Sequence, residues 1–294
     1  MKKVLITGAN SYIGTSFENW IKDNEPDIIT DTLDMKSDTW KQEDFSKYDA
    51  IFHVAGIAHA DVGKVTQDQK ELYYKVNAEL TKECAQKAKK EGVKQFVFMS
   101  SIIVYGESAG MGKECVITKD TPLASANFYG DSKVKAEEKL QELSEDKFRI
   151  VILRPPMIYG KGSKGNYPLL SKMARKLPFF PKVINQRSML YIGNLCKFVS
   201  CVILREETGI FYPQNKEYVN TSEMVKYIAN AKAKKIHLTR CFNPVLKLMS
   251  KTGGKPGRLV NKAFGNMVYE KSMSQYDFEY QIYDLPQSIG LTEK

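Results

Sequence analysis

The chain contains a tyrosine and a lysine four residues apart, Tyr129 and Lys133, in the run Tyr-Gly-Asp-Ser-Lys. This spacing places both side chains on one face of a helix. A phenol has a pKa of about 10, and a fixed ammonium nearby favours the phenolate and so lowers that pKa. The pair is therefore predicted to act as a general acid–base near neutral pH.

Two adjacent serines, Ser100 and Ser101, end an apolar run that is predicted to be a buried strand. The carboxyl ends of parallel strands form the edge at which open α/β sheets bind ligands. A serine hydroxyl at this edge can hydrogen-bond the same substrate oxygen that exchanges a proton with Tyr129. We therefore predict that the serines contact a substrate.

A short turn from Gly8 to Gly14 lies between the first predicted strand and the first predicted helix. Glycines there let the backbone approach a pyrophosphate, whose charge the amides of the helix N-terminus stabilise. Asp34, 20 residues after Gly14, ends the second predicted strand, where a carboxylate accepts hydrogen bonds from the adenosine ribose. Because a carboxylate repels a 2′-phosphate, the pattern predicts NAD rather than NADP. The simpler alternative is that Asp34 only terminates its strand.

Short apolar runs alternate with longer amphipathic runs through the first half of the chain. Buried strands are predicted at residues 3–7, 28–33, 50–54, 95–100 and 150–153. Helices are predicted at residues 12–24, 73–91 and 128–144. This alternation is typical of an α/β protein with a Rossmann-type doubly wound parallel sheet, covered by helices on both faces.

The pattern becomes irregular near residue 160, where glycines and prolines interrupt the apolar runs. We therefore predict a dinucleotide-binding domain over residues 1–160 and a smaller, mixed α/β substrate-binding lobe over residues 161–294. A recrossing of the chain between the lobes near residues 185–200 is left open. A glycine-rich stretch at residues 253–257 is interpreted as a linker between two helices.

The composition is that of a folded protein. Of the 294 residues, 43% are hydrophobic and 27% are charged, which excludes disorder. No run approaches the roughly 18 to 20 apolar residues of a membrane span, and the apolar run at the amino terminus is too short for a signal peptide. The five cysteines lack Cys-x-x-Cys spacing, so we interpret them as reduced thiols that bind no metal. A cytoplasmic location is expected.

The net charge of +10 is concentrated in residues 224–269, which contain no Asp or Glu. The ten basic residues of this segment are Lys226, Lys232, Lys234, Lys235, Arg240, Lys247, Lys251, Lys255, Arg258 and Lys262. One interpretation is a solvated face that keeps the protein soluble. Another is contact with an anionic membrane surface on its inner side, because four apolar residues have helical spacing between the lysines. These four are Phe242, Val245, Leu246 and Met249. Nucleic-acid binding is not expected, because no recognition motif accompanies the charge.

Several motifs resemble the extended short-chain dehydrogenase/reductases and, within these, the nucleotide-sugar epimerase/dehydratase family. They are Thr7 to Gly14, His53 to Gly56, Asn77, Ser100 to Gly106 and Tyr129 to Lys133. Two later segments, Arg154 to Gly160 and Asn185 to Ile192, are similar to bacterial capsule and O-antigen enzymes that act at C4 of a sugar nucleotide. The resemblance covers about residues 3 to 230.

The resemblance implies a role for each matching residue. Tyr129 is the implied acid–base, Lys133 its activator and a ligand of the nicotinamide ribose, and Ser101 the catalytic hydroxyl. The implied cofactor contacts are Gly8, Asn10, Ser11, Tyr12, Ile13, Gly14, Asp34, Ala55, Gly56, Asn77, Tyr129, Lys133 and Pro156. The implied substrate contacts are Ser100, Ser101, Asn166 and Arg187, with Arg187 gripping the diphosphate. A homodimer built on the Tyr129 helix and its neighbour is also implied.

The chain departs from the family pattern at two positions. Ser11 stands where the family has its middle glycine, and a side chain there narrows the approach of the backbone to phosphate. Asn194 stands where many relatives have an acidic residue, and the sequence offers no interpretation of that change.

Three reactions share such a site in the resembling family. A 4,6-dehydratase needs an extra acid and base after the catalytic hydroxyl residue, where this chain has Ile102 and Ile103, so dehydration is not expected. A 4-keto reductase and a 4-epimerase both need only the tyrosine, the lysine, the serine and the nicotinamide. The short second lobe and the capsule-enzyme resemblance favour reduction of a UDP-4-keto-6-deoxy-N-acetylhexosamine in surface-polysaccharide biosynthesis. Asp34 and its preference for NAD suit the alternative, a 4-epimerase of UDP-glucose or UDP-N-acetylglucosamine. A non-catalytic dinucleotide-binding module is the second alternative, although such proteins usually lose the tyrosine or the lysine.

Overall fold

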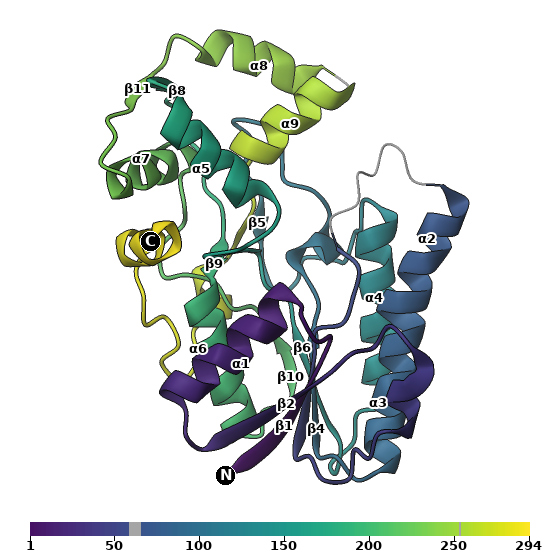
Figure 1. Ribbon diagram of the computed structural model, residues 1–294. Helices are drawn as coiled ribbons and strands as arrows, with labels where there is room; N and C mark the ends of the chain where they lie inside the picture. The colour runs from purple at the N-terminus through teal and green to yellow at the C-terminus, as the bar shows by residue number, and fades with distance from the viewer. Residues whose placement is uncertain (59–65, 253) are drawn as a thin grey trace.

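A six-stranded parallel sheet forms the centre of the molecule, with the strand order β2-β1-β3-β4-β6-β10 (Figure 1). The strands are β1 (Lys2–Thr7), β2 (Ile28–Leu33), β3 (Ala50–His53), β4 (Gln95–Met99), β6 (Arg149–Leu153) and β10 (Gly209–Phe211). The structure is a computed structural model, and it describes residues 1–58, 66–252 and 254–294. Because every neighbouring pair is parallel, all six carboxyl ends meet at one edge of the sheet.

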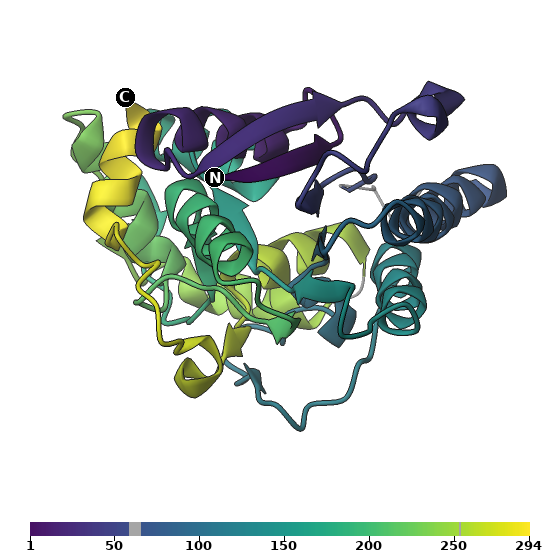
Figure 2. The ribbon, with the colours of Figure 1, turned by 90° about the horizontal axis from the view of Figure 1, so that it is seen from below.

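Helices cover both faces of this sheet, as Figures 1 and 2 show. One face carries α1 (Tyr12–Asn24) and α6 (Ile192–Leu204), which contact each other. The other face carries α3 (Leu80–Lys90) and α4 (Phe128–Gln141). A π-helical turn, η2 (Lys75–Glu79), joins α3 to α2 (Gln67–Tyr74), which also packs along α4. The predicted α/β class with a doubly wound parallel sheet is confirmed.

Alternating side chains along each strand explain why both faces need helices. Val4 and Ile6 of β1 belong to the core beneath α1 and α6, whereas Leu5 belongs to the core beneath α3 and α4. Strand β4 repeats the pattern, with Val97 on the first side and Phe98 on the second. Such strands appear in the sequence as continuous apolar runs, because successive side chains point to opposite buried faces.

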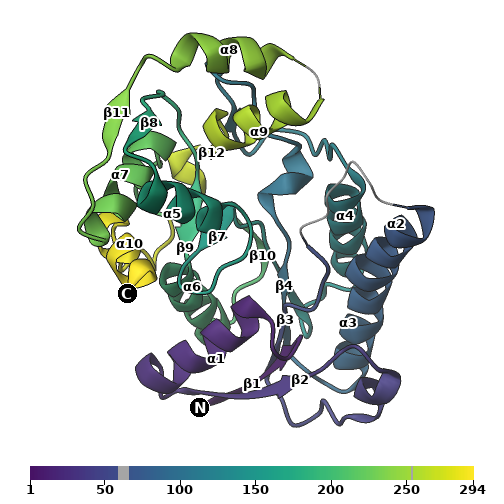
Figure 3. The same cartoon turned by 45° about the horizontal axis from the view of Figure 1, so that its top comes forward.

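A smaller lobe lies beyond the carboxyl edge of the sheet (Figure 3). Its helices are α5 (Asn166–Lys176), α7 (Thr221–Ala231), α8 (Asn243–Lys251), α9 (Gly254–Phe264) and α10 (Leu285–Glu293). Parallel strand pairs are β5 (Val116–Ile117) with β12 (Val268–Tyr269), β7 (Met157–Tyr159) with β9 (Met189–Tyr191), and β8 (Phe179–Pro181) with β11 (His237–Thr239). Short 3₁₀ helices are η1 (Asp38–Gln42), η3 (Ile102–Tyr105) and η4 (Lys271–Ser274).

The chain does not divide at residue 160 into two consecutive domains. After α5 and β9 it returns to the sheet, where α6 packs on α1 and β10 pairs with β6, with Ile210 opposite Ile152. Residues 192–211 therefore belong to the sheet layer and not to the smaller lobe, which corrects the predicted lobe of residues 161–294. This return to the sheet ends at residue 211, beyond the recrossing that the sequence left open near residues 185–200. The physical reason is that α6 is apolar around most of its circumference, so it needs the sheet and α1 to bury it.

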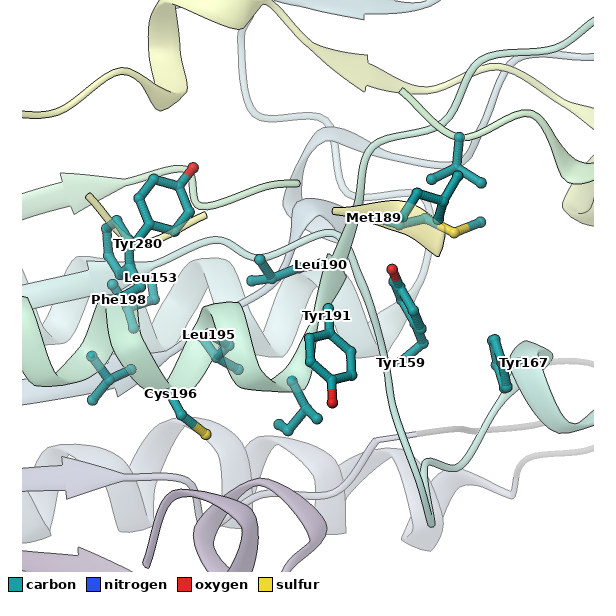
Figure 4. Close-up of a cluster of buried hydrophobic side chains, with 14 of the residues drawn as sticks. Leu153, Tyr159, Tyr167, Met189, Leu190, Tyr191, Leu195, Cys196, Phe198 and Tyr280 are labelled. Carbon is teal, nitrogen blue, oxygen red and sulfur yellow. The ribbon is translucent and has the colours of Figure 1, made fainter. Parts of the chain in front are cut away.

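The sheet and the smaller lobe share one hydrophobic core, part of which is shown in Figure 4. The ring centroid of Tyr159 lies 5.5 Å from that of Tyr167 and 5.7 Å from that of Tyr191. The Tyr159 hydroxyl accepts a hydrogen bond from Asn215 Nδ2 at 2.9 Å and lies 2.6 Å from Ser288 Oγ. Because buried hydroxyls need partners, this cluster holds segments from both parts of the chain together.

Most of the predicted elements agree with the observed ones to within one or two residues. The helix predicted at residues 73–91 begins earlier, at Gln67, where Thr66 and Gln69 form a capping box. Strand β10 was not predicted, because its three residues carry too little pattern. The predicted linker at 253–257 is wrong after its first residue: Gly254 begins α9, and Gly253 lies outside the described residues. No helix within the described ranges has the length and apolar character needed to cross a membrane.

Candidate active site

The turn from β1 into α1 lies tightly against the end of β3. Gly8 has a φ of +101°, and a Cβ atom there would come within 2.8 Å of the Ala55 amide nitrogen. The amides of Gly8 and Ala9 both donate to Leu33 O, at 2.8 and 3.0 Å, which holds the turn at the carboxyl edge. Since only glycine tolerates this conformation and this approach, two predicted cofactor residues meet in one backbone cradle.

Ser11, at the position of the family's middle glycine, caps helix α1. Its hydroxyl accepts a hydrogen bond from Gly14 N at 3.1 Å. Gly14 is itself closely packed, because a Cβ atom there would lie 3.1 Å from Ile6 Cγ2. The serine satisfies one free amide of the first turn and keeps its own proton as a donor. The departure from glycine therefore stabilises the helix end that is suited to phosphate.

The other residues of the predicted dinucleotide site surround this turn. Asn10 has a φ of +63°, and the Tyr12 side chain is directed toward Gly160, where a Cβ atom would lie 2.6 Å from the Tyr12 hydroxyl oxygen. Asp34 is exposed directly after β2, and its Oδ1 accepts a hydrogen bond from Lys36 N at 2.9 Å. The second carboxylate oxygen of Asp34 is thus available to ribose hydroxyls, and the cradle and carboxylate together fit a dinucleotide.

Two further residues predicted to contact the cofactor have buried or partly buried side chains. Ile13 is partly buried against the core shared with α6. Pro156 is buried at the end of β6, after Pro155, whose carbonyl accepts a hydrogen bond from Ile102 N at 2.9 Å. Both residues lie near the carboxyl edge of the sheet, and their contact with the cofactor stays a prediction.

Tyr129 lies in the first turn of α4, beside Ser101. Asn127 caps this helix by accepting a hydrogen bond from Gly130 N at 3.0 Å. A Cβ atom on Gly130 would lie 3.0 Å from Ile103 O, so α4 and η3 approach each other closely. Burial raises the pKa of Tyr129 to about 12, and hydrogen bonding to Ser101 opposes this effect. The structure thus brings the predicted acid–base and the predicted catalytic hydroxyl together.

Lys133, one turn further along α4, does not lower the Tyr129 pKa as the sequence led us to expect. Its Nζ donates to Met99 O at 2.8 Å and lies 4.5 Å from the ring centroid of Phe98. Burial lowers the pKa of Lys133 to about 8, and the charge of Glu137 opposes this effect. The expectation of a lowered tyrosine pKa is therefore wrong for these side chains alone, because burial favours the neutral form of each group.

Asn77 holds the loop that follows β3. Its Oδ1 accepts from Ile57 N at 2.8 Å, while its Nδ2 donates to Ile57 O and to Ser132 Oγ, each at 3.0 Å. A Cβ atom on Gly56 would lie 3.1 Å from Asn77 Oδ1 and 3.5 Å from Lys133 Nζ. Asn77 lies in the π-helical turn η2, a feature that is frequent at functional sites. Both atoms of the Asn77 side-chain amide are engaged within the protein, and they hold Gly56 beside Lys133. The predicted cofactor contact of Asn77 stays a prediction.

A buried ion pair behind the tyrosine and lysine was not predicted. Arg154 Nη2 lies 2.6 Å from Glu137 Oε2, and the two residues are 5% and 1% exposed. Ser100 Oγ donates to Glu137, and Arg154 Nη1 donates to Tyr105 OH at 2.6 Å. The proton of the Ser100 hydroxyl is thus engaged in this network, and the predicted substrate contact of Ser100 stays a prediction. Successive residues of an extended chain point to opposite sides, so Ser101 faces Tyr129 instead. The only sign of this ion pair in the sequence was Glu137, an acidic residue one helical turn after Lys133.

Arg187 and Asn166, the other predicted substrate contacts, line the same small pocket of the smaller lobe, which has a volume of about 40 Å³. Arg187 donates from Nη1 to Lys262 O, and burial lowers its pKa. No carboxylate among the described residues forms an ion pair with Arg187, and a half-buried guanidinium in this state is suited to an anionic diphosphate. The lining of this pocket does not include Tyr129 or Ser101, so the structure presents the predicted site as two groups of residues.

Comparison with known proteins identifies a family for the sheet and for part of the smaller lobe. A model of the NAD dependent epimerase/dehydratase family matches residues 4–219. A UDP-glucose 4-epimerase of Vibrio cholerae is 29% identical over 251 residues, which cover 78% of this chain and 76% of that protein. An N-acetyl-alpha-D-glucosaminyl-diphospho-ditrans,octacis-undecaprenol 4-epimerase of Escherichia coli O157:H7 is 28% identical over 252 residues, which cover 79% of this chain and 73% of that protein.

Solved structures share the fold along nearly the whole chain. A dTDP-4-dehydrorhamnose reductase of Clostridium acetobutylicum has a TM-score of 0.71 at 19% identity, over 98% of this chain and 97% of that chain. A UDP-glucuronic acid 4-epimerase of Bacillus cereus in complex with NAD has a TM-score of 0.71 at 15% identity, over 98% of this chain and 96% of that chain. At these identities the likeness concerns the fold.

Proposed function

The chain belongs to the NAD dependent epimerase/dehydratase family, and on this premise we propose that it transfers hydride at C4 of a UDP-linked hexose. It is an NAD(P)-dependent enzyme of the nucleotide-sugar epimerase and reductase class. The reaction we propose is the reduction of a UDP-4-keto-6-deoxy-N-acetylhexosamine for surface polysaccharide.

The observation that carries the proposal is that Tyr129 lies beside Ser101 at the carboxyl edge of the sheet. Because burial raises its pKa to about 12, Tyr129 keeps its proton at neutral pH and is ready to act as an acid. Reduction of a ketone needs such an acid at the oxygen that becomes an alkoxide. An epimerase uses the phenolate to oxidise the alcohol and then the same phenol to protonate the returning alkoxide, so this acid serves both candidates.

We assign the proton transfer to Tyr129 and the orientation of the carbonyl to Ser101. The dinucleotide supplies the hydride. Tyr129 donates its hydroxyl proton to the C4 oxygen, and the Ser101 hydroxyl hydrogen-bonds the same oxygen. Lys133 Nζ, which donates to Met99 O and lies close to Gly56, would hydrogen-bond the ribose of a bound nicotinamide. Gly8, Ser11, Gly14 and Asp34 would hold the rest of the dinucleotide.

The second candidate is a 4-epimerase, and the relatives favour it. The Vibrio cholerae protein carries the name UDP-glucose 4-epimerase, and the Escherichia coli protein is named as a 4-epimerase of a sugar carried on undecaprenyl diphosphate. Both sugar carriers present a diphosphate, the group for which we propose Arg187 as the ligand. A homodimer through α4 and its neighbouring helix, and a cytoplasmic or membrane-peripheral location, are further proposals.

Turnover of defined substrates decides between the candidates. The purified protein is incubated with NADH or NADPH and a UDP-4-keto-6-deoxy-N-acetylhexosamine, and nicotinamide absorbance is followed while the sugar product is identified. A reductase consumes one nicotinamide for each sugar reduced. Unchanged absorbance together with interconversion of UDP-glucose or UDP-N-acetylglucosamine and its C4 epimer would establish the epimerase instead. Cofactor binding with neither reaction would indicate the non-catalytic module.

A further inference from the structure

Helices α8 and α9 form the outer end of the smaller lobe, away from the sheet (Figures 1 and 3). Helix α9 is anchored by Val260 and Phe264, which are 5% and 6% exposed, and Phe264 packs against Phe180. Helix α8, which is described over its whole length, has no fully buried residue. Its Leu246 and Met249, expected in the outward apolar stripe, instead pack partly against the core. The exposed residues of α8 are Pro244, Val245, Lys247, Leu248 and Lys251.

The open surface of this helix pair carries large apolar side chains. Phe242, just before α8, is 46% exposed, and Val245 and Leu248 on α8 are 59% and 68% exposed. Leu259 on α9 is 58% exposed. Single exposed apolar residues are ordinary, but several on one short helix pair mark an interaction surface.

Basic side chains accompany these apolar ones. Lys247 and Lys251 on α8 and Lys262 on α9 are exposed, and the surrounding residues 224–269 include no Asp or Glu. Arg258 differs, because it lines a second cavity together with Glu107 and Asp131. The outer face is therefore cationic as well as apolar.

We propose that α8 and α9 dock this protein on an anionic lipid bilayer, with Val245 and Leu248 entering the interfacial region and Lys247 and Lys251 contacting headgroups. Helices that lie in a membrane interface combine these two kinds of side chain. A merely solvated face would explain the lysines but leave the apolar side chains in water. An acidic protein or a nucleic acid would engage the charge and leave Leu248 without a role.

Docking also sets where the substrate pocket lies. Helix α9 forms one wall of the Arg187 pocket through Leu259, Lys262 and Ala263, so a docked α9 brings that pocket to the bilayer. A sugar diphosphate carried by a membrane polyprenol would then reach Arg187 as directly as a nucleotide sugar. This consequence rests on the proposed function, whereas the docking does not.

Flotation of the full-length, NAD-saturated protein with vesicles tests the docking without substrate. We expect it to float with phosphatidylethanolamine–phosphatidylglycerol vesicles and not with phosphatidylcholine vesicles, and we expect binding to weaken as salt screens the charges. One basic residue near an anionic surface contributes about fivefold in affinity, so Lys247→Glu/Lys251→Glu should weaken binding at least 25-fold. Leu248→Asp, which leaves the lysines in place, should weaken it at least tenfold.

A matched variant controls for net charge. Lys94→Glu/Lys147→Glu makes the same charge change at two exposed positions before β4 and β6, at the opposite end of the sheet, and should bind as the parent does. Equal losses in both double variants, unchanged binding of Leu248→Asp, or binding to RNA but not to vesicles would overturn the proposal. NAD affinity and circular dichroism establish that each variant is folded.

A second measurement tests whether docking affects the turnover of a sugar that is carried on a membrane lipid. Vesicles should raise turnover of a polyprenyl-diphosphate sugar in the parent and not in Leu248→Asp, whereas turnover of the UDP-sugar should not change. Vesicle-independent rates with both carriers would contradict a role for docking in substrate access. Absence of all turnover, with flotation intact, would contradict the proposed function and leave the docking standing.

Discussion

At the scale of single residues, burial acts on Tyr129 and Lys133 in opposite directions along the pH axis. It raises the pKa of Tyr129 to about 12 and lowers that of Lys133 to about 8, so both groups are shifted toward their neutral forms. At neutral pH the phenol keeps its proton, and the lysine is still mostly charged. In this state the phenol can donate a proton, as the role proposed for Tyr129 requires.

Replacement of Tyr129 by Phe removes the proton donor and keeps the ring. We expect turnover to fall by about 10² to 10⁴, while the dissociation constant for NAD stays within about twofold. Steady-state kinetics and titration with NAD measure the two quantities. Unchanged turnover would remove Tyr129 from the mechanism, and a parallel loss of NAD binding would show that the ring is structural.

Glu137 and Arg154 show what burial demands of a charged pair. Neither charge has access to water, so each depends on the other and on Ser100 and Tyr105. Glu137 lies one turn after Lys133 on α4, and its partners come from the ends of β4 and β6. The pair thereby fixes the helix that carries the acid–base to the strand edge, as a positioning contact.

Glu137→Gln should lower the free energy of unfolding by about 3 to 5 kcal/mol, because it leaves Arg154 buried without a counter-charge. Glu137→Gln/Arg154→Met should recover much of that loss, since no unpaired charge remains. Denaturant titration measures both. The matched control, Glu18→Gln in the exposed pair with Lys22, should change stability by no more than about 0.5 kcal/mol. A double variant less stable than the single one would contradict this explanation.

At the scale of elements, the decisive contact is between α4 and η3. Gly130 allows the helix to approach the Ile103 carbonyl, and this approach brings Tyr129 to Ser101. Elsewhere the glycine turn of β1 depends on the end of β3 in the same way, since a side chain on Gly8 would meet Ala55. Close backbone approach, rather than side-chain chemistry, therefore assembles the edge of the sheet.

Gly130→Ala places a Cβ atom 3.0 Å from Ile103 O and from Ser125 Cβ, so α4 must move away by a few tenths of an ångström. We expect kcat to fall about tenfold, because small misplacements of catalytic groups are costly, with NAD affinity unchanged. The control is Gly290→Ala, another helical glycine, where a Cβ atom would meet nothing within 4 Å. That variant should keep full activity and gain about 0.5 to 1 kcal/mol of stability. Full activity of Gly130→Ala would argue against the close approach as a requirement.

At the scale of the whole molecule, the two groups of residues proposed to bind ligands lie at different parts of one continuous core. The residues proposed for the dinucleotide follow β1, β2 and β3, whereas the Arg187 pocket is enclosed by α5, α7 and α9. The tyrosine cluster around Tyr159 holds the two parts together. Hydride transfer at C4 requires both ligands at once, so the relative position of the two parts is a functional property.

Two single variants, each expected to weaken the binding of one ligand only, test whether the two groups of residues bind different ligands. Arg187→Met should raise the dissociation constant for UDP at least tenfold and leave NAD binding unchanged, because the guanidinium is the proposed ligand of the diphosphate. Asp34→Ala should do the reverse, weakening NAD about tenfold and leaving UDP binding unchanged. Isothermal titration of each protein with each ligand gives four values. A variant that weakens both ligands equally would indicate a folding defect or a shared site.

The sequence by itself determined the parallel sheet, its first helices and the residues of the glycine turn and of the Tyr129 helix. Apolar periodicity, glycines at strand ends and the four-residue spacing of Tyr129 and Lys133 are local properties, and local properties are legible in a linear pattern. Resemblance to the family, rather than a local pattern, placed Arg187 and Asn166 among the predicted substrate residues.

Only the tertiary structure decided which of two adjacent serines faces Tyr129, that Glu137 pairs with Arg154, and that residues 192–211 return to the sheet. It also reversed the expected direction of the Tyr129 pKa. These features depend on contacts between residues far apart in the chain and on how much water surrounds them. A strand end, a helix turn and a distant arginine acquire their roles only when folding buries them together, because burial sets both the partners of a polar group and its charge.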